Sequence, residues 1–248
     1  MVNEEGEEPT LARDSFEELR YIFNWSVSSK YYSLGDIILI GGWAVHSFNP
    51  WKYSLDIDFI VSGRFKKSLQ SHLYSSRKYS KERNSSGNTL FLKSLDSGNI
   101  YLDFLPKKDQ FHGTGKTLNL LKIDCETTTK NISYSSGTEF SVIVPEISML
   151  FLLKLKAAWD RYYELSREIV QDKEHLNDKF TKDCGDIVAL LQSSEFQFAR
   201  FDWLSTRISE FDFLKDLLKQ GIIEANSTFD HASRNETKAL VRKLLSLI

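Results

Sequence analysis

Cysteine is scarce in this sequence, since the 248 residues contain only Cys125 and Cys184. Two cysteines can form at most one disulfide, and these two show no C-x-x-C spacing. We therefore expect two reduced thiols in a cytoplasmic protein. The five histidines are scattered along the chain, which argues against a zinc site built on clustered ligands.

Long apolar runs and a basic excess are also missing. The longest apolar run, Ile147 to Leu153, is far too short to cross a bilayer, so we expect no membrane partner. Residues Met1 to Pro9 are acidic and polar, the opposite of a signal peptide, and we expect a frayed tail there. The net charge of −2 gives no overall sign of nucleic-acid binding, although a local basic patch would be compatible with it.

The composition that remains is that of an ordinary globular protein, with 41% hydrophobic and 27% charged residues. Strand-like patterns lie before Pro145, and almost everything after it has helical periodicity. Pro145 and Glu146 suit the first turn of a helix. We therefore expect an α/β (α+β) fold, with a short mixed sheet in residues 1–144 and a helical domain in residues 145–248.

Periodicity and turn signals also place individual elements. A helix is expected from Asp14 or Ser15 to about Tyr32, and another over residues 64–75. Strands are expected at residues 37–40, 54–61, 78–83, 89–95, 100–106 and 140–144.

The stretch over residues 37–61 combines the features that bear on chemistry. Its first apolar strand is followed by Gly41 and Gly42, which we expect to turn the chain into a short helix. Glycine allows a backbone to approach a ligand closely, and free N–H groups at a helix N-terminus favour phosphate. A Gly-Gly turn is a weak signal on its own, and it gains meaning only beside a second chemical feature.

Asp56 and Asp58 lie two residues apart on the expected strand 54–61, so both side chains would point to one face of the sheet. Two neighbouring carboxylates repel each other unless a cation lies between them. Mg²⁺ selects carboxylate oxygens, usually with substrate phosphates completing its shell. The pair therefore predicts a metal site, with an ordinary acidic pair on an exposed strand edge as the alternative.

Two elements of this stretch together match a known signature, namely Gly41-Gly42-Trp43-Ala44-Val45 and Ser54-x-Asp56-x-Asp58-Phe59. They resemble the signature of the DNA-polymerase-β-type nucleotidyltransferase superfamily, and in particular its abortive-infection branch, the AbiEii-like toxins of toxin–antitoxin systems. The resemblance implies a two-metal mechanism, in which Asp56 and Asp58 hold two ions of Mg²⁺ or Mn²⁺, and a helical domain (residues 145–248) that closes the nucleotide cleft. It also implies that Gly41, Gly42 and Ser54 contact phosphate oxygens.

Asp103 is the candidate for a third acidic ligand. It interrupts an otherwise apolar strand, Ile100 to Pro106, and a carboxylate in a buried strand is costly unless it is paired or binds a metal. The superfamily places its third acid on such a strand, beside Asp56 and Asp58. Asp103 would then bind the catalytic metal and help to deprotonate an attacking hydroxyl. A hydrogen-bonded structural aspartate is the alternative.

Residues 113–117, Gly-Thr-Gly-Lys-Thr, look like the end of a P-loop. The first glycine of G-x-x-x-x-G-K-[ST] would fall at Gln110, and no clear helical pattern comes after Thr117. We therefore expect a flexible surface loop here.

Two later elements extend the resemblance: Lys154-Leu155-x-Ala157-x-x-x-Arg161 and Lys182-Asp183-x-x-Asp186-Ile187. In the family they lie close together, whereas residues 162–181 intervene here. The resemblance implies that Lys154 and Arg161 bind the nucleotide, and that Asp183 or Asp186 holds one of these cations in position. A solvated helix face with ordinary charge pairs is the alternative.

The expected activity is metal-dependent transfer of a nucleoside monophosphate from a nucleoside triphosphate to an acceptor hydroxyl. By resemblance the acceptor would be tRNA or another RNA, and the protein a toxin controlled by an antitoxin protein. The alternatives are an antibiotic-type enzyme with a small-molecule acceptor and a catalytically silent nucleotide- or partner-binding module. Arg200, Trp203 and Arg207 could form a nucleic-acid surface, with plain helix packing as the alternative.

Overall fold

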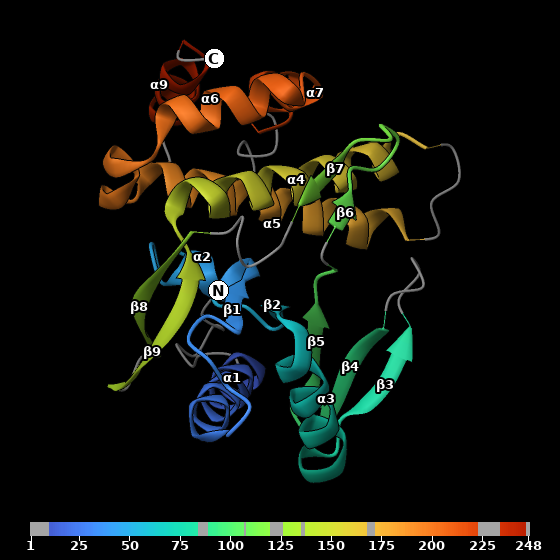
Figure 1. Ribbon diagram of the computed structural model, residues 1–248. Helices are drawn as coiled ribbons and strands as arrows, with labels where there is room; N and C mark the ends of the chain where they lie inside the picture. Colours follow the sequence, from blue (N-terminus) through green and yellow to red (C-terminus); the bar gives the residue numbers. More distant parts are fainter. Residues whose placement is uncertain are drawn as a thin grey trace. The chain divides into compact units, whose positions relative to one another are not determined.

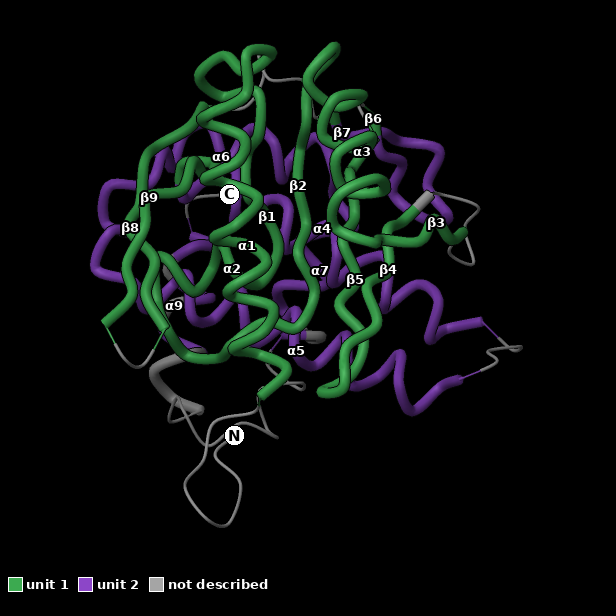
Figure 2. Tube along the Cα trace, turned by 90° about the horizontal axis from the view of Figure 1, so that it is seen from below, with its two compact units in different colours: residues 1–108, 119–146 green, residues 109–118, 147–248 purple. Residues whose placement is uncertain are grey.

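The structure is a computed structural model that describes residues 10–83, 89–106, 108–119, 126–134, 137–167, 172–222 and 234–246. The expected N-terminal tail and Cys125 lie outside the described residues. The chain divides into two compact units (Figure 2), unit 1 with residues 1–108 and 119–146 and unit 2 with residues 109–118 and 147–248.

A mixed five-stranded sheet forms the centre of unit 1. Its strands run in the order β1 (Ile37–Ile40), β2 (Ile57–Val61), β5 (Gly98–Phe104), β4 (Thr89–Leu95) and β3 (Ser80–Arg83), from left to right in Figure 1. β2 and β5 are parallel, and the other neighbours are antiparallel. The structure thereby confirms the expected α/β class with a short mixed sheet.

Burial explains the order of these strands. Every residue of β1 is buried, as its unbroken apolar sequence requires. Every residue of β3 is exposed, and its sequence Ser-Lys-Glu-Arg places charges on the edge of the sheet. Charged side chains on an edge strand discourage pairing with other chains.

Three helices accompany this sheet: α1 (Thr10–Ser28), α2 (Gly41–His46) and α3 (Gly63–Arg77). α3 buries Phe65, Leu69 and Leu73, which recur every fourth residue. Trp43 of α2 donates its indole N–H to Ser15 Oγ of α1 over 3.0 Å within the core. The expected first helix therefore exists, although it ends at Ser28 and not at Tyr32.

A separate antiparallel ribbon completes unit 1. It consists of β8 (Thr127–Tyr134) and β9 (Thr138–Pro145), which pair from Thr127 with Pro145 to Tyr134 with Thr138. The strand expected at residues 140–144 is therefore part of a longer one. It was expected to be the last strand of the main sheet, and this was wrong, because its hydrogen-bonding partner is β8.

Unit 2 is mainly helical, as expected for the chain after Pro145. Its two long helices, α4 (Ile147–Leu165) and α5 (Lys173–Gln192), pack against each other. Asp172 caps α5 by accepting a hydrogen bond from the backbone N–H of His175. The shorter elements are η2 (Ser194–Phe198), α6 (Phe201–Glu210), α7 (Phe213–Asp216), η3 (Leu217–Gly221) and α9 (Arg234–Leu245).

The residues that look like a P-loop lie in a ribbon formed by β6 (Lys108–Gln110) and β7 (Thr117–Asn119). A strand comes after Lys116 where a P-loop requires a helix, so the P-loop interpretation is excluded. Two hydrogen bonds, each 3.0 Å long, also hold this turn on α4. The backbone N–H of His112 donates to Asp160 Oδ1, and Trp159 Nε1 donates to the carbonyl oxygen of His112. The segment is thus an anchored turn, where a flexible loop was expected.

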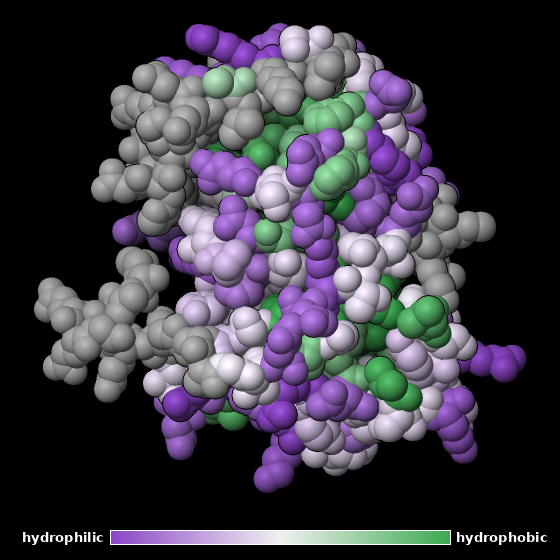
Figure 3. All heavy atoms as spheres, turned by 90° about the vertical axis from the view of Figure 1, so that its left-hand side faces the viewer, coloured by the Kyte–Doolittle hydropathy of each residue, from purple (hydrophilic) through white to green (hydrophobic). Residues whose placement is uncertain are grey.

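Within the described ranges, no helix is long and apolar enough to cross a membrane. On the face shown in Figure 3, hydrophilic residues predominate and hydrophobic ones form small, separate patches.

Candidate functional site

Asp58 and Asp103 are register neighbours on the parallel strands β2 and β5. Side chains of neighbouring residues in register project from the same face of a sheet, and adjacent strands lie about 4.8 Å apart. Both carboxylates are half-buried. The topology thus brings together two acids that are 45 positions apart, close enough for one cation to bind both.

Gly41 lies directly against this pair. In the β1–β2 register Ile40 faces Asp58, and the next residue, Gly41, begins α2 with a φ of +71°. A β-carbon at this position would lie 2.0 Å from Asp58 Oδ2, far inside any normal contact. Glycine is therefore required here for two reasons: the left-handed backbone and the close approach of the carboxylate.

We expect Gly41→Ala to destabilise the protein more than Gly115→Ala, its matched control. Both glycines have a φ of +71°, but a β-carbon at Gly115 would meet nothing within 4 Å. Left-handed backbone costs each variant about 1–2 kcal/mol, and the collision with Asp58 adds about 1–3 kcal/mol at Gly41. Urea unfolding measures the difference, and equal losses of stability would contradict the close contact.

Asp56 is placed differently from the expectation. β2 begins at Ile57, and Asp56 lies one residue earlier in a bend. The strand expected from residue 54 therefore begins only at Ile57, because the extended segment is shorter than the apolar pattern indicates, and a shared face of Asp56 and Asp58 stays a prediction. The buried Ser54 donates its hydroxyl to the carbonyl oxygen of Asp56 over 3.0 Å and so stabilises this bend. A phosphate contact of Ser54 or of Gly42 stays a prediction.

The donor set fits a magnesium site with few protein ligands. In the part of the chain that the structure describes, no three His, Cys, Asp or Glu side chains form a group that could hold a metal ion. Asp58 and Asp103 are nevertheless a pair of carboxylates, and Asp58 lies against Gly41 at the start of α2. Mg²⁺ commonly takes only one or two carboxylates and completes its shell with water and substrate phosphates. The pair meets that requirement without Asp56.

Lys66 is a residue near the site that sequence patterns did not indicate. It lies on α3, with its Nζ 5.5 Å from the centre of the Phe104 ring. Burial lowers the pKa of Lys66, and the negative charge of Asp103 partly opposes that shift. A cation therefore lies close enough to influence Asp103. The sequence signal was weak, because the rotation of α3 relative to β5 is fixed by tertiary packing alone.

In unit 2, Lys154 forms the centre of a buried charge cluster between α4 and α5. Its Nζ lies 3.2 Å from Asp183 Oδ1 and 2.5 Å from Asp186 Oδ2, and its side chain is only 7% exposed. The outer members are Lys182, whose Nζ is 3.6 Å from Asp186, and Arg161, whose Nε is 3.9 Å from Asp183. The alternative of a solvated helix face is therefore wrong for Lys154, which is buried. Its role in nucleotide binding stays a prediction.

Arg200, Trp203 and Arg207 also lie together. The guanidinium carbon of Arg200 is 4.6 Å from the centre of a Trp203 ring, and that of Arg207 is 5.8 Å away. Arg207 also pairs with Glu210 over 2.8 Å. These contacts are those of ordinary helix packing, and a nucleic-acid role for them stays a prediction.

The described thiol, Cys184, is a free cysteine buried in α5. Burial raises its pKa well above the usual value, and the neighbouring Asp183 and Asp186 add to the shift. A neutral, enclosed thiol is a poor nucleophile and a poor metal ligand. Cys184 is therefore a packing residue.

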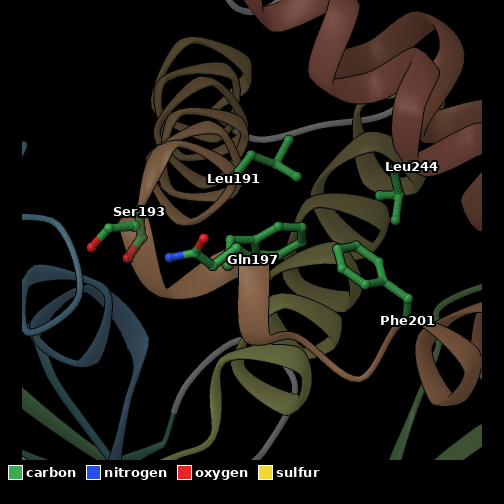
Figure 4. Close-up of a pocket in the computed structure, with 7 residues that line it drawn as sticks. Leu191, Ser193, Gln197, Phe201 and Leu244 are labelled. Atoms are coloured by element: carbon green, nitrogen blue, oxygen red, sulfur yellow. The ribbon is translucent and has the colours of Figure 1, made fainter.

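Unit 2 contains a pocket of about 360 Å³, shown in Figure 4. Its lining consists of Leu191, Ser193, Ser194, Phe196, Gln197, Phe201 and Leu244. None of these side chains ionises near neutral pH, so the pocket contains no acid, base or strong metal ligand.

The acidic pair Asp58 and Asp103 with Gly41 is thus the arrangement that best combines partial burial with two neighbouring carboxylates. A scan of protein-family models finds none that matches this chain, and no curated protein matches it.

Proposed function

We propose that this chain is a metal-dependent nucleotidyltransferase of the DNA-polymerase-β type, resembling the AbiEii-like toxins. The observation that carries the proposal is the register pairing of Asp58 with Asp103 beside Gly41. Two carboxylates held side by side repel each other, and a divalent cation between them turns that cost into binding energy. The order of a strand, a Gly-Gly turn, a helix and a strand with an acid at its second residue supports the same proposal.

Asp58 and Asp103 would hold Mg²⁺ or Mn²⁺, and Asp56 would approach from the bend before β2. Both ions suit oxygen ligands. A bound ion would offset the charge of the triphosphate and make an acceptor hydroxyl more acidic. Gly41, which has no side chain, lets the Asp58 carboxylate lie against its backbone, and a contact of that backbone with a phosphate oxygen is part of the proposal.

The proposed reaction forms a bond between the acceptor oxygen and the α-phosphorus. The bond from that phosphorus to the bridging oxygen breaks, and pyrophosphate leaves with the electron pair. The hydroxyl proton would pass to a carboxylate, for which Asp103 is the candidate.

By resemblance, Arg161 and Lys154 of unit 2 would contribute to nucleotide binding. Arg161 is 38% exposed, and among the described residues its ion-pair partner is Asp183 at 3.9 Å, so its guanidinium would also be able to reach phosphate oxygens. Lys154 is enclosed by Asp183 and Asp186, which offset much of its charge. Lys154 would therefore act mainly by holding α5 against α4, with direct contact to phosphate as a smaller contribution.

The test is incubation of the pure protein with each α-labelled nucleoside triphosphate, Mg²⁺ and total cellular RNA. Transfer of label to RNA supports the proposal and identifies the acceptor. Label on small molecules instead would support an antibiotic-type enzyme. Nucleotide binding without any release of pyrophosphate would contradict the proposal and support a silent binding module.

A further inference from the structure

A second feature of unit 1 lies between α1 and α3, which pack side by side (Figure 1). A pocket of about 560 Å³ opens there, and we call it the α1–α3 groove. It is lined by Trp25, Tyr31, Arg64, Lys67, Ser68, Ser71, His72 and Ser75.

The groove is positively charged, although the chain as a whole has a net charge of −2. Arg64 and Lys67 are exposed on α3, and no carboxylate occurs among the lining residues. α3 has no acidic residue along its length, whereas its other two cations lie beside carboxylates, Arg77 with Glu18 and Lys66 with Asp103. A local basic patch of this kind is the electrostatic feature that nucleic-acid phosphates require.

Two described carboxylates on neighbouring segments, Asp36 and Glu17, have partners of their own. Asp36 accepts hydrogen bonds from the backbone N–H of Ser33 over 2.8 Å and from Ser62 Oγ over 2.5 Å. Glu17, on α1, pairs with Arg20 over 2.5 Å. Within the described part of the chain neither Arg64 nor Lys67 pairs with a carboxylate, and both are exposed to a partner in solution.

Flat aromatic surfaces accompany these cations. The Trp25 ring stacks on His72 with a centroid distance of 4.1 Å and an interplanar angle of 5°. Tyr21 also stacks on His72 and bonds to its Nε2 over 3.1 Å, so the stack is fixed in place. Tyr31 is 53% exposed, with the Lys30 ammonium 5.0 Å from its ring centre.

We infer that the α1–α3 groove binds a single-stranded RNA segment. Arg64 and Lys67 contact its phosphates, and its bases stack on Trp25 and Tyr31. Proteins bind single strands through this combination of a basic groove and aromatic platforms, whereas double-stranded RNA is recognised mainly by shape. An acidic peptide would satisfy the charges but leave the aromatic rings unused. The inference rests on the proposed function for its biological role, which is to hold the RNA acceptor.

The first test measures fluorescence anisotropy of a labelled single-stranded 12-mer RNA, without nucleotide, over a series of salt concentrations. Arg64→Gln with Lys67→Gln should weaken binding at least tenfold. It should also reduce the slope of log K against log salt by about 1.4, since each lost phosphate contact removes about 0.7. The matched control is Lys81→Gln with Arg83→Gln, which makes the same charge change on exposed residues of β3. This control protein should keep most of the wild-type affinity for the RNA.

Tyr31→Ala separates base stacking from charge. It should weaken RNA binding by about fivefold or more and leave the salt slope unchanged. The inference is overturned if both groove variants bind RNA like the wild type. It is also overturned if poly-glutamate displaces the RNA from the wild type as well as unlabelled RNA does, because simple charge attraction would then account for the binding.

Transfer assays distinguish a failure of this inference from a failure of the proposed function. The Arg64→Gln/Lys67→Gln protein should show a raised KM for RNA with nucleotide binding unchanged, and Asp58→Asn should bind RNA normally. If the wild type labels an acceptor but does not bind the 12-mer through the groove, the inference alone fails. If the groove binds RNA and neither the wild type nor Asp58→Asn transfers label, the proposed function fails and the groove remains.

Discussion

Asp58→Asn is expected to lower nucleotidyl transfer by on the order of 10²–10³-fold or more, comparable with removing one electrostatic group from other active sites. The same change should raise the melting temperature of the metal-free protein. Asp58 and Asp103 are neighbours in register with half-buried carboxylates, and like charges directly opposite each other destabilise a sheet by about 0.2–1 kcal/mol. Asparagine keeps the shape of the side chain and removes one charge, so activity falls while stability rises.

The matched control is Asp96→Asn. Asp96 is exposed in the turn between β4 and β5, at the opposite end of β5 from Asp103, so this change alters the net charge equally without touching the pair. Transfer and melting temperature should stay near the wild-type values. Calorimetry in a MgCl₂ series adds a second readout, because an ion that binds only the folded protein raises its melting temperature. MgCl₂ should raise the melting temperature of the wild type and of Asp96→Asn, and this rise should be largely lost in Asp58→Asn. Equal rises in all three proteins would refute the assignment of Asp58 as a metal ligand.

The acidic residues of the candidate site can be proposed from the sequence, but their arrangement in the sheet cannot. Alternation along one strand was expected to pair Asp56 with Asp58, but β2 begins at Ile57, and Asp58 is a register neighbour of Asp103. Such a pairing depends on which strands become neighbours in the sheet, and local periodicity contains no information about that choice. The buried strands themselves were predictable, because four consecutive apolar residues at Ile37–Ile40 are costly to expose.

The α1–α3 groove is another feature that depends on tertiary packing and is not predictable from local sequence patterns. The basic residues Arg64 and Lys67 are visible in the sequence, and so is Trp25, but they are about 40 positions apart. Only the packing of α1 against α3 brings them to one surface. Lys66 is a second example, because its relation to Asp103 depends on how α3 is rotated against the sheet.

Lys154→Met is expected to destabilise the protein by about 3–5 kcal/mol, the usual cost of removing one partner from a buried ion pair. Its ammonium lies between Asp183 and Asp186, whose side chains are 11% and 2% exposed. Methionine fills a similar volume, so the loss comes from two carboxylates left in a poorly solvated place. The matched control is Lys182→Met. The Lys182 side chain is 29% exposed and its Nζ lies 3.6 Å from Asp186, a longer and better solvated contact, so this change should lower the free energy of unfolding by less than about 1 kcal/mol.

A second substitution identifies the origin of that loss. Adding Asp186→Asn to Lys154→Met removes one of the stranded charges and should restore about half of the lost stability in urea unfolding, whereas Asp186→Asn alone should destabilise the protein. Equal costs for Lys154→Met and Lys182→Met would show that the cluster is well solvated and would contradict its burial. If the rescued double variant is folded and still binds nucleoside triphosphate, Lys154 acts by joining α4 to α5. If that variant is folded but no longer binds the nucleotide, Lys154 contacts the triphosphate directly.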